Sequence, residues 1–508
     1  MKINLIEYFE QTVKENSDKT AVVDGESRIN FSELYTRVLG LASQILEIPE
    51  KTINRPVAVY LPKSIECIIA DIAITFSGNA YMNLDIKSPA TRIESILTTI
   101  DPLLIITDEK HIHLLKNADF SGKIITIQSQ FTKNIRKNKI QDTLIQIIDT
   151  DPYCIINTSG STGTPKGVVL NQKSFIDFTE WAIETLEISN IEIVGSLSPV
   201  VFDIFSFELC MLMVKGNTLV LIPEHLNAFP VRILELLHRE KISFIFWVPT
   251  IMVNIANMNL LESFNLPDLK SIWFAGEVFP TKQFNFWKKH LPETKFVNLY
   301  GPIEITLDCT YFIADRTLKD DEPIPIGFPC RNTDILILNE NNLPVTSHEE
   351  GELFVRGTSL AMGYYNNPEK TSEAFIQNPL NNHYPEIIYR TGDIVYRNDR
   401  GEIMFKGRKD SLIKHLGYRI ELAEIEHILV NSLKIADNAC VVYQKEKKEI
   451  TVFYESLSEI PVSEFRRKLA GVLPKYMIPT VFIYTSQLPR NTNGKIDRLK
   501  LQNQVNES

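Results

Sequence analysis

This sequence of 508 residues lacks the cysteine and histidine patterns of disulfide-rich or zinc-binding proteins. Its six cysteines, at positions 67, 154, 210, 309, 330 and 440, include no CxxC pair, and its nine histidines form no HExxH or HxxxH set. Scattered cysteines of this kind are typical of reduced thiols in a cytoplasmic protein. We therefore expect a cytoplasmic location, with neither a disulfide framework nor a zinc site.

Membrane-spanning and nucleic-acid-binding patterns are also missing. No apolar run approaches the ~20 residues that a membrane helix needs. The N-terminal stretch MKINLIEYFEQ carries an acidic residue early, which is unlike a signal peptide. The net charge of −10 argues against general nucleic-acid binding, because that requires a basic face. We expect neither a membrane nor a nucleic acid among the partners.

The chain is too long for a single hydrophobic core, so at least two domains are expected. An apolar run at residues 57–61 predicts a buried strand, and residues 64–77 predict a helix that stops at Gly78. Ser32 is the expected N-cap of an earlier helix. Strand and helix patterns alternate again over residues 218–252, and such alternation predicts parallel α/β sheets.

Residues 157–168, with the sequence NTSGSTGTPKGV, lie between two apolar runs. Glycines let backbone N–H groups turn inward, and together with hydroxyls and a lysine they form an anion site. The string differs from the common P-loop, in which Gly and Lys are adjacent and Ser or Thr follows. We predict a strand, a mobile loop that holds phosphate and a second strand; a flexible surface loop is the alternative. The expected phosphate ligands are Thr158, Ser159, Gly160, Ser161, Thr162, Gly163 and Lys166.

The whole string resembles the phosphate-binding loop of the adenylate-forming superfamily, which includes acyl-CoA synthetases, luciferases and the adenylation domains of peptide synthetases. Further motifs follow in the family's order from about residue 5 to 500, and they are most similar to stand-alone amino-acid adenylation enzymes such as D-alanine–carrier protein ligases. The resemblance implies a large α/β domain of parallel sheets with added β elements over residues 1–409. It implies a small mobile α+β lid over residues 410–508, hinged at Asp410.

Two strand patterns, at residues 271–277 and 296–304, run into loops that the resemblance assigns to the nucleotide. Ligands of open parallel sheets bind at the carboxyl ends of the strands, so both loops are expected near ATP. An aromatic face suits a purine, and a carboxylate suits two ribose hydroxyls. By resemblance, Gly276, Glu277 and Asn298 flank the adenine, Tyr300 stacks on it beside Gly301, Asp393 takes the ribose hydroxyls, and Arg408 also reaches the nucleotide.

The resemblance assigns the catalytic roles to Glu304 and Lys495. Glu304, in the string YGPIE, matches the family glutamate that holds Mg²⁺, an ion that prefers oxygen ligands. Lys495, in NTNGKIDR, matches the lysine that contacts the substrate carboxylate and the α-phosphate. The family usually has a threonine where this chain has Ile303, and a lost buried hydrogen bond costs ~1–3 kcal/mol. We expect reduced activity, or compensation by Thr306 or the 158–162 loop, but not inactivity.

Asp203 is the main indicator of an amino-acid substrate. It lies in an apolar stretch, where burying an unpaired carboxylate costs several kcal/mol, so a partner is expected. A buried salt bridge or a helix cap is one possibility, and a substrate ammonium is the other. In peptide-synthetase adenylation domains the matching aspartate pairs with the α-amino group, whereas fatty acyl and aryl members usually lack it. The resemblance lines the pocket, which Trp273 and Phe207 should make small, with Asp203, Ile204, Phe207, Thr250, Trp273, Ala275, Leu299, Leu307 and Asp308.

Together these residues predict ATP-dependent activation of a small or medium amino acid as aminoacyl-AMP, followed by transfer to a phosphopantetheine thiol. The family uses the loop around Gly417 to line the pantetheine tunnel. Because no carrier segment follows Arg498, the phosphopantetheinylated carrier protein is expected to be separate. Two alternatives remain open: an acyl- or aryl-CoA synthetase, and a non-catalytic nucleotide-binding relative suggested only by Ile303.

Overall fold

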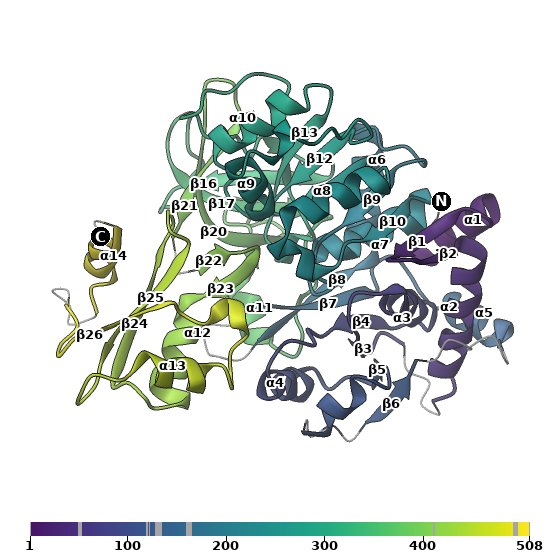
Figure 1. The fold of residues 1–508 in the computed structure, drawn as a ribbon, viewed down its shortest axis with the longest axis horizontal. Helices are drawn as coiled ribbons and strands as arrows, with labels where there is room; N and C mark the ends of the chain where they lie inside the picture. The colour runs from purple at the N-terminus through teal and green to yellow at the C-terminus, as the bar shows by residue number, and fades with distance from the viewer. Residues whose placement is uncertain are drawn as a thin grey trace.

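The computed structural model describes residues 2–48, 53–117, 120, 122–127, 135–158, 165–409, 412–490 and 496–506. It has mixed α/β layers built on two large sheets with mainly parallel strands, which confirms the predicted fold class (Figure 1). A third, antiparallel sheet and a C-terminal α+β unit complete the described fold. No helix in these ranges combines the length and apolar character needed to cross a bilayer.

The first large sheet has nine strands in the order β15-β14-β13-β12-β11-β9-β10-β1-β2. The strands from β13 to β1 are parallel, and the edges are antiparallel. Its members are β1 Thr20–Asp24, β2 Ser27–Asn30, β9 Ile193–Ser196, β10 Thr218–Leu221, β11 Phe244–Trp247, β12 Ser271–Phe274, β13 Lys295–Tyr300, β14 Thr310–Ile313 and β15 Phe328–Pro329.

The second large sheet has seven strands in the order β18-β8-β7-β4-β3-β5-β6, and it is parallel from β7 to β6. β7 and β8 form an antiparallel hairpin that carries the predicted phosphate loop. The members are β3 Pro56–Tyr60, β4 Ala80–Asn83, β5 Leu104–Thr107, β6 Lys123–Thr126, β7 Pro152–Thr158, β8 Lys166–Asn171 and β18 Gly363–Tyr364.

Two helices, α3 (Ile65–Phe76) and α7 (Asp203–Lys215), lie between the large sheets. Both are apolar around most of their circumference, as expected of helices packed on all sides. The remaining helices of this part are α1 Leu5–Asn16, α2 Phe31–Ile45, α4 Ala90–Ile100, α5 Lys137–Leu144, α6 Gln172–Thr185, α8 Pro230–Arg239, α9 Pro249–Asn257, α10 Thr281–His290 and α11 Pro368–Ala374.

Helix ends follow local capping chemistry. The predicted helix at 64–77 is confirmed as α3: the Ser64 side chain accepts a hydrogen bond from the Cys67 N–H, and Gly78 follows with φ +75°. The predicted Ser32 cap is wrong. The Asn30 side chain caps α2 by accepting from the Glu33 N–H at 2.8 Å, because Asn30 is the last extended residue of β2.

The third sheet lies between the large sheets and the C-terminal unit in Figure 1. Its strands are β16 Thr333–Leu338, β17 Gly351–Gly357, β19 Phe375–Gln377, β20 Ile387–Arg397 and β21 Ile403–Arg408. The C-terminal unit comprises β22 Leu412–His415, β23 Tyr418–Glu421, α12 Leu422–His427, β24 Asn438–Gln444, β25 Glu449–Glu455, α13 Val462–Leu469, β26 Val481–Tyr484 and α14 Arg498–Asn506. It has its own apolar clusters, whereas the predicted hinge Asp410 lies outside the described residues.

Candidate nucleotide and substrate site

The phosphate loop starts and ends at paired positions of a hairpin. Thr158 at the end of β7 lies opposite Lys166 at the start of β8, so the two predicted strands around the loop are confirmed. The Lys166 side chain is largely buried, with 14% of its surface exposed. Five of the predicted phosphate ligands lie outside the described residues, namely Ser159, Gly160, Ser161, Thr162 and Gly163.

The two predicted nucleotide loops leave the same edge of the nine-stranded sheet. β12 and β13 are parallel neighbours, with Phe274 opposite Asn298, so the loops that follow them lie side by side. Gly276 has φ +90°. At Gly301 a Cβ atom would come within 2.3 Å of the Leu307 carbonyl oxygen, so only glycine allows this close approach.

Three predicted nucleotide residues form one hydrogen-bonded group. Asp393 and Arg408 are opposite each other across β20 and β21, and the guanidinium Nη1 lies 2.6 Å from the carboxylate Oδ1. The Tyr300 hydroxyl donates a hydrogen bond to the other oxygen of Asp393. Burial raises the pKa of Asp393, and Arg408 opposes that shift. Asn298 is placed differently, since its side-chain amide donates to the Pro325 carbonyl oxygen at 2.7 Å.

Two pocket aspartates feel the charge of a lysine of the C-terminal unit. Asp203 is the first residue of α7, and its Oδ1 accepts from the Ile204 N–H at 2.9 Å. No side chain among the described residues donates a hydrogen bond to Asp203 or to Asp308, which is 3% exposed. Burial raises the pKa of Asp203 to about 6, and Lys414 of β22 opposes the shift. Burial and then the Asp203 charge hold the pKa of Asp308 well above its usual range.

The predicted pocket wall is closely packed. Phe207 and Trp273 are fully buried and stack on each other, with ring centroids 5.8 Å apart. Thr250 differs from the rest, because it is only partly buried and donates a hydrogen bond to Glu277, a predicted adenine neighbour. The other apolar members, each at most 6% exposed, are Ile204, Ala275, Leu299 and Leu307.

Glu304 is fully buried and carries a negative charge in this arrangement. The Tyr364 hydroxyl donates to its Oε1 at 2.7 Å, and Nη1 of Arg419 lies 2.5 Å from its Oε2. Burial alone would raise the pKa of Glu304, but Arg419 outweighs it and the pKa falls to about 2. A carboxylate suits Mg²⁺, so the residue type fits the predicted role. Arg419 supplies the compensating positive charge here, and no cluster of three metal-ligating side chains occurs in the described ranges.

The β22–β23 hairpin places further charged residues in the site that the sequence reasoning did not single out. Nζ of Lys166 lies 2.8 Å from Oε1 of Glu421, and the Gly417 N–H donates to Glu277 at 2.7 Å. Lys414 and Arg419 come from the same hairpin. The available signal for this contact was a short strand–turn–strand pattern that contains lysine, arginine and glutamate. Such residues stay buried only when they are paired, so their presence there indicates partners elsewhere in the chain.

Ile303 and Thr306 lie on either side of Glu304. Ile303 is partly buried and packs against the large core cluster. Thr306 is fully buried, and its hydroxyl has no hydrogen-bond partner among the described atoms. This burial does not support the expectation that Thr306 replaces the missing family threonine; the 158–162 loop remains the other expected source of a donor.

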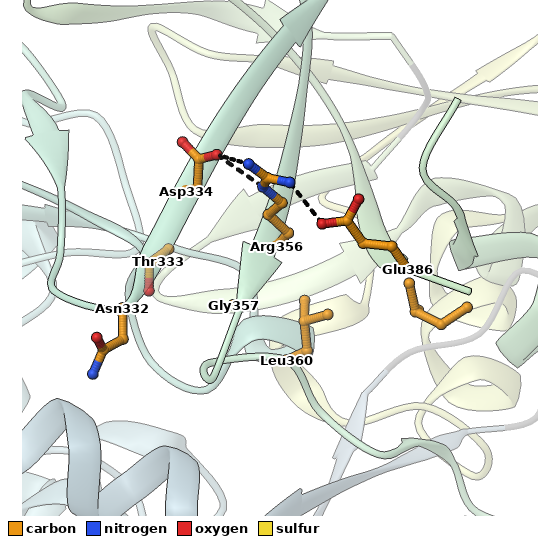
Figure 2. Close-up of a pocket in the computed structure, with 8 residues that line it drawn as sticks. Asn332, Thr333, Asp334, Arg356, Gly357, Leu360 and Glu386 are labelled. Carbon is orange, nitrogen blue, oxygen red and sulfur yellow. Dashed lines mark hydrogen bonds and ion pairs between the residues drawn. The ribbon is translucent and has the colours of Figure 1, made fainter. Parts of the chain in front are cut away.

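A cavity of about 430 Å³ lies beside the third sheet and contains none of the predicted site residues. Figure 2 shows Arg356 in its wall between Asp334 and Glu386, at 2.8 and 2.6 Å. Two carboxylates already compensate this guanidinium, so the cavity is not an evident anion site.

Comparisons with known proteins agree with the geometry. The family described as AMP-binding enzyme matches residues 9–365. Gramicidin S synthase 1 of Brevibacillus brevis is 30% identical over 97% of this chain, but the match spans only 44% of that relative. Zwittermicin A synthase ZmaJ of Bacillus cereus is 28% identical, and the match covers 96% of this chain and 93% of the relative.

Solved structures show the same fold. The Vibrio cholerae adenylation domain AlmE, in complex with glycyl-adenosine-5'-phosphate, superimposes with a TM-score of 0.84 at 20% identity, covering 100% of this chain and 98% of that one. The o-succinylbenzoate CoA synthetase of Bacillus subtilis gives a TM-score of 0.82 at 18% identity, covering 99% of this chain and 98% of that one.

Proposed function

The chain belongs to the AMP-binding enzyme family, and we propose that it activates a small or medium amino acid and loads it onto a carrier protein. Family membership implies an ATP-dependent, adenylate-forming ligase of the type found in peptide synthetases. The observation that supports an amino acid is Asp203, a carboxylate in an apolar wall with no side-chain donor among the described residues. ATP–pyrophosphate exchange over a panel of amino acids and other acids tests the proposal.

The proposed reaction has two steps. The amino-acid carboxylate attacks the α-phosphate of ATP and pyrophosphate leaves; a phosphopantetheine thiol then attacks the carbonyl of aminoacyl-AMP and AMP leaves. Because the first two reactants are anionic, positioning and charge neutralisation are the main contributions of the protein. Lys166 and the 158–163 loop would hold phosphate, and Lys495, outside the described residues, would contact the reacting oxygens. Bound at Glu304, Mg²⁺ would neutralise phosphate charge.

The position of the C-terminal unit supports the second step. The β22–β23 hairpin contacts the site, whereas α14, which follows residues 491–495, lies on the far side of the C-terminal unit (Figure 1). We propose that the C-terminal unit rotates about Asp410 between the two steps, which would exchange Lys495 for a thiol path near Gly417. Residues 1–409 and 410–508 would then be the two moving parts, and exclusion of water would protect the adenylate between the steps.

Asp308 is the proposed selectivity residue of the pocket. Its carboxyl would take a hydroxyl, a ring N–H or a second amine of the substrate side chain, because a buried polar group gains most from a specific partner. In Asp308→Ala we expect the preferred amino acid to lose about tenfold in kcat/KM relative to an apolar amino acid of similar size. Exchange rates for both amino acids measure the ratio; an unchanged ratio would show that Asp308 is not a selectivity residue.

The raised pKa of Asp203 gives the expected pH dependence. Only the ionised carboxylate attracts an ammonium group, and its pKa is about 6 against an ordinary value near 3.9. We therefore expect kcat/KM for the amino acid to fall about tenfold per pH unit below that pKa. The residual activity of Asp203→Asn should lack this acidic limb, and a limb that persists in the variant would belong to another group.

An acyl- or aryl-CoA synthetase is the second candidate. The structural likeness to a CoA synthetase favours it, and Asp203 counts against it because such acids have no ammonium to bind. A fatty or aromatic acid that drives exchange would decide for it. Absence of exchange with every acid would instead support a non-catalytic relative, in which Ile303 has removed a needed donor.

The carrier and the location stay proposals. We propose that the carrier is a separate chain and that neither a membrane nor a nucleic acid is a partner. The six cysteines are all buried and unpaired, which supports a cytoplasmic location.

A further inference from the structure

Two ion pairs join the β22–β23 hairpin to the residues that are proposed to hold Mg²⁺ and phosphate. Arg419 pairs with Glu304 at 2.5 Å, and Glu421 pairs with Lys166 at 2.8 Å. The side chains are 17% and 0% exposed in the first pair, and 13% and 14% exposed in the second. Arg419 and Glu421 are two residues apart on one strand, so they project from the same face.

The signs of these charges match those of the proposed ligands. Glu304 is paired with the positive charge of Arg419 and would be paired in the same way with Mg²⁺. Lys166 is paired with the negative charge of Glu421 and would be paired in the same way with a phosphate group. A buried charge that loses its partner is strongly destabilised. Glu304 and Lys166 are therefore both compensated while the hairpin is docked, without any nucleotide.

We infer that Arg419 and Glu421 replace Mg²⁺ and phosphate, so that the docked hairpin and the magnesium complexes of ATP or pyrophosphate exclude one another. This inference rests on the proposed function. Its consequence is an ordered exchange: the hairpin docks only after magnesium pyrophosphate has left, which delays the thiol until the adenylate is formed. A fresh MgATP displaces the hairpin by taking both of its partners.

The chain offers a matched control among the other docking contacts. Arg92 of α4 pairs with Glu424 of α12 at 2.7 Å, and these side chains are 9% and 0% exposed. This pair also holds the C-terminal unit in place, yet it includes neither Glu304 nor Lys166. Weakening it should loosen docking without changing how MgATP competes with the hairpin.

Docking can be followed by cross-linking the full-length protein. The Thr91 hydroxyl donates to the Gly471 carbonyl oxygen across the interface at 2.8 Å, and both residues are exposed. A Cβ at Gly471 meets no atom closer than 3.4 Å, so cysteines at both positions should be tolerated. The native cysteines are buried, so a short bis-maleimide should react mainly at the new pair.

The readout is the ratio of cross-linking rates without and with saturating MgATP. With the wild-type hairpin we expect a ratio of about ten or more, because two ligands that exclude each other are strongly coupled. Arg419→Met/Glu421→Gln should bring the ratio to about one, and Arg419→Lys alone, which keeps the charge, should retain most of it. Glu424→Gln should lower both rates and leave the ratio near the wild-type value.

Separate ligands test the two residues individually. Arg419→Met should abolish the effect of adding Mg²⁺ to ATP, and Glu421→Gln should reduce the effect of ATP given with EDTA. A double variant that keeps the wild-type ratio would overturn the inference, as would a control that loses it. Equilibrium dialysis with ATP distinguishes failure of the proposed function from failure of this inference. Absence of ATP binding to the wild-type protein would refute the proposed function. ATP binding without any change in cross-linking would refute only the mutual exclusion of the hairpin and MgATP.

Discussion

Replacing Asp203 by alanine is expected to lower amino-acid-dependent adenylation about 100-fold or more, because removing one partner of a buried ion pair costs about 3 kcal/mol or more. The loss should appear in kcat/KM for the amino acid. Its physical basis is the position of Asp203 at the start of α7, where the backbone orients the carboxylate and no side chain of the described residues donates a hydrogen bond to it. Pyrophosphate exchange with the preferred amino acid measures the loss.

The substrate itself provides the control for Asp203. An analogue of the preferred amino acid without its α-amino group should be a poor substrate of the wild-type enzyme, and Asp203→Ala should not lower its rate further. Thermal unfolding of the variant separates misfolding from lost recognition. If Asp203→Ala kept full activity with the amino acid, the carboxylate would not bind the ammonium group.

Replacing Lys495 by alanine is expected to slow adenylate formation about 100- to 1,000-fold, the usual loss when one group that stabilises developing charge is removed. Transfer of the aminoacyl group from a supplied aminoacyl-AMP to a pantetheine thiol should stay within about twofold of the wild-type rate. The reason is the proposed withdrawal of Lys495 during the second step. Separate single-turnover assays of the two steps measure this difference.

The matched control for Lys495 is Lys500→Ala, which removes an exposed lysine of α14 in the same segment. This variant should retain both steps. Equal loss of both steps in Lys495→Ala would show that the lysine is needed throughout the cycle, and the proposed exchange of catalytic faces would then be wrong.

Local patterns predicted much of the fold, and the family resemblance supplied the candidate nucleotide site. The apolar run at β3 and the Gly78 stop after α3 act within a few residues, so they could be read directly. Tyr300 and Asp393 were assigned from motif resemblance, and the structure joins them in one hydrogen bond. The Ser32 prediction failed because Asn30, two residues earlier, is also a residue type that caps helices. Asn30 is the last residue of β2 and caps α2 instead.

The contacts of the C-terminal unit could not be predicted from the sequence. Arg419 reaches a partner 115 residues away, and Glu421 is paired with a residue 255 positions earlier. Such pairs depend on how two units are oriented, which no local pattern specifies. The burial of Thr306 was missed for a similar reason, because tertiary packing, not the neighbouring sequence, turns its hydroxyl away from solvent.

The most direct test of amino-acid activation is ATP–pyrophosphate exchange with all standard amino acids, their D forms, and matched acids that lack the α-amino group. The account predicts that one small or medium amino acid gives the highest rate and that its des-amino analogue is at least about 100-fold poorer. Equal or faster exchange with acids that have no ammonium group would contradict it.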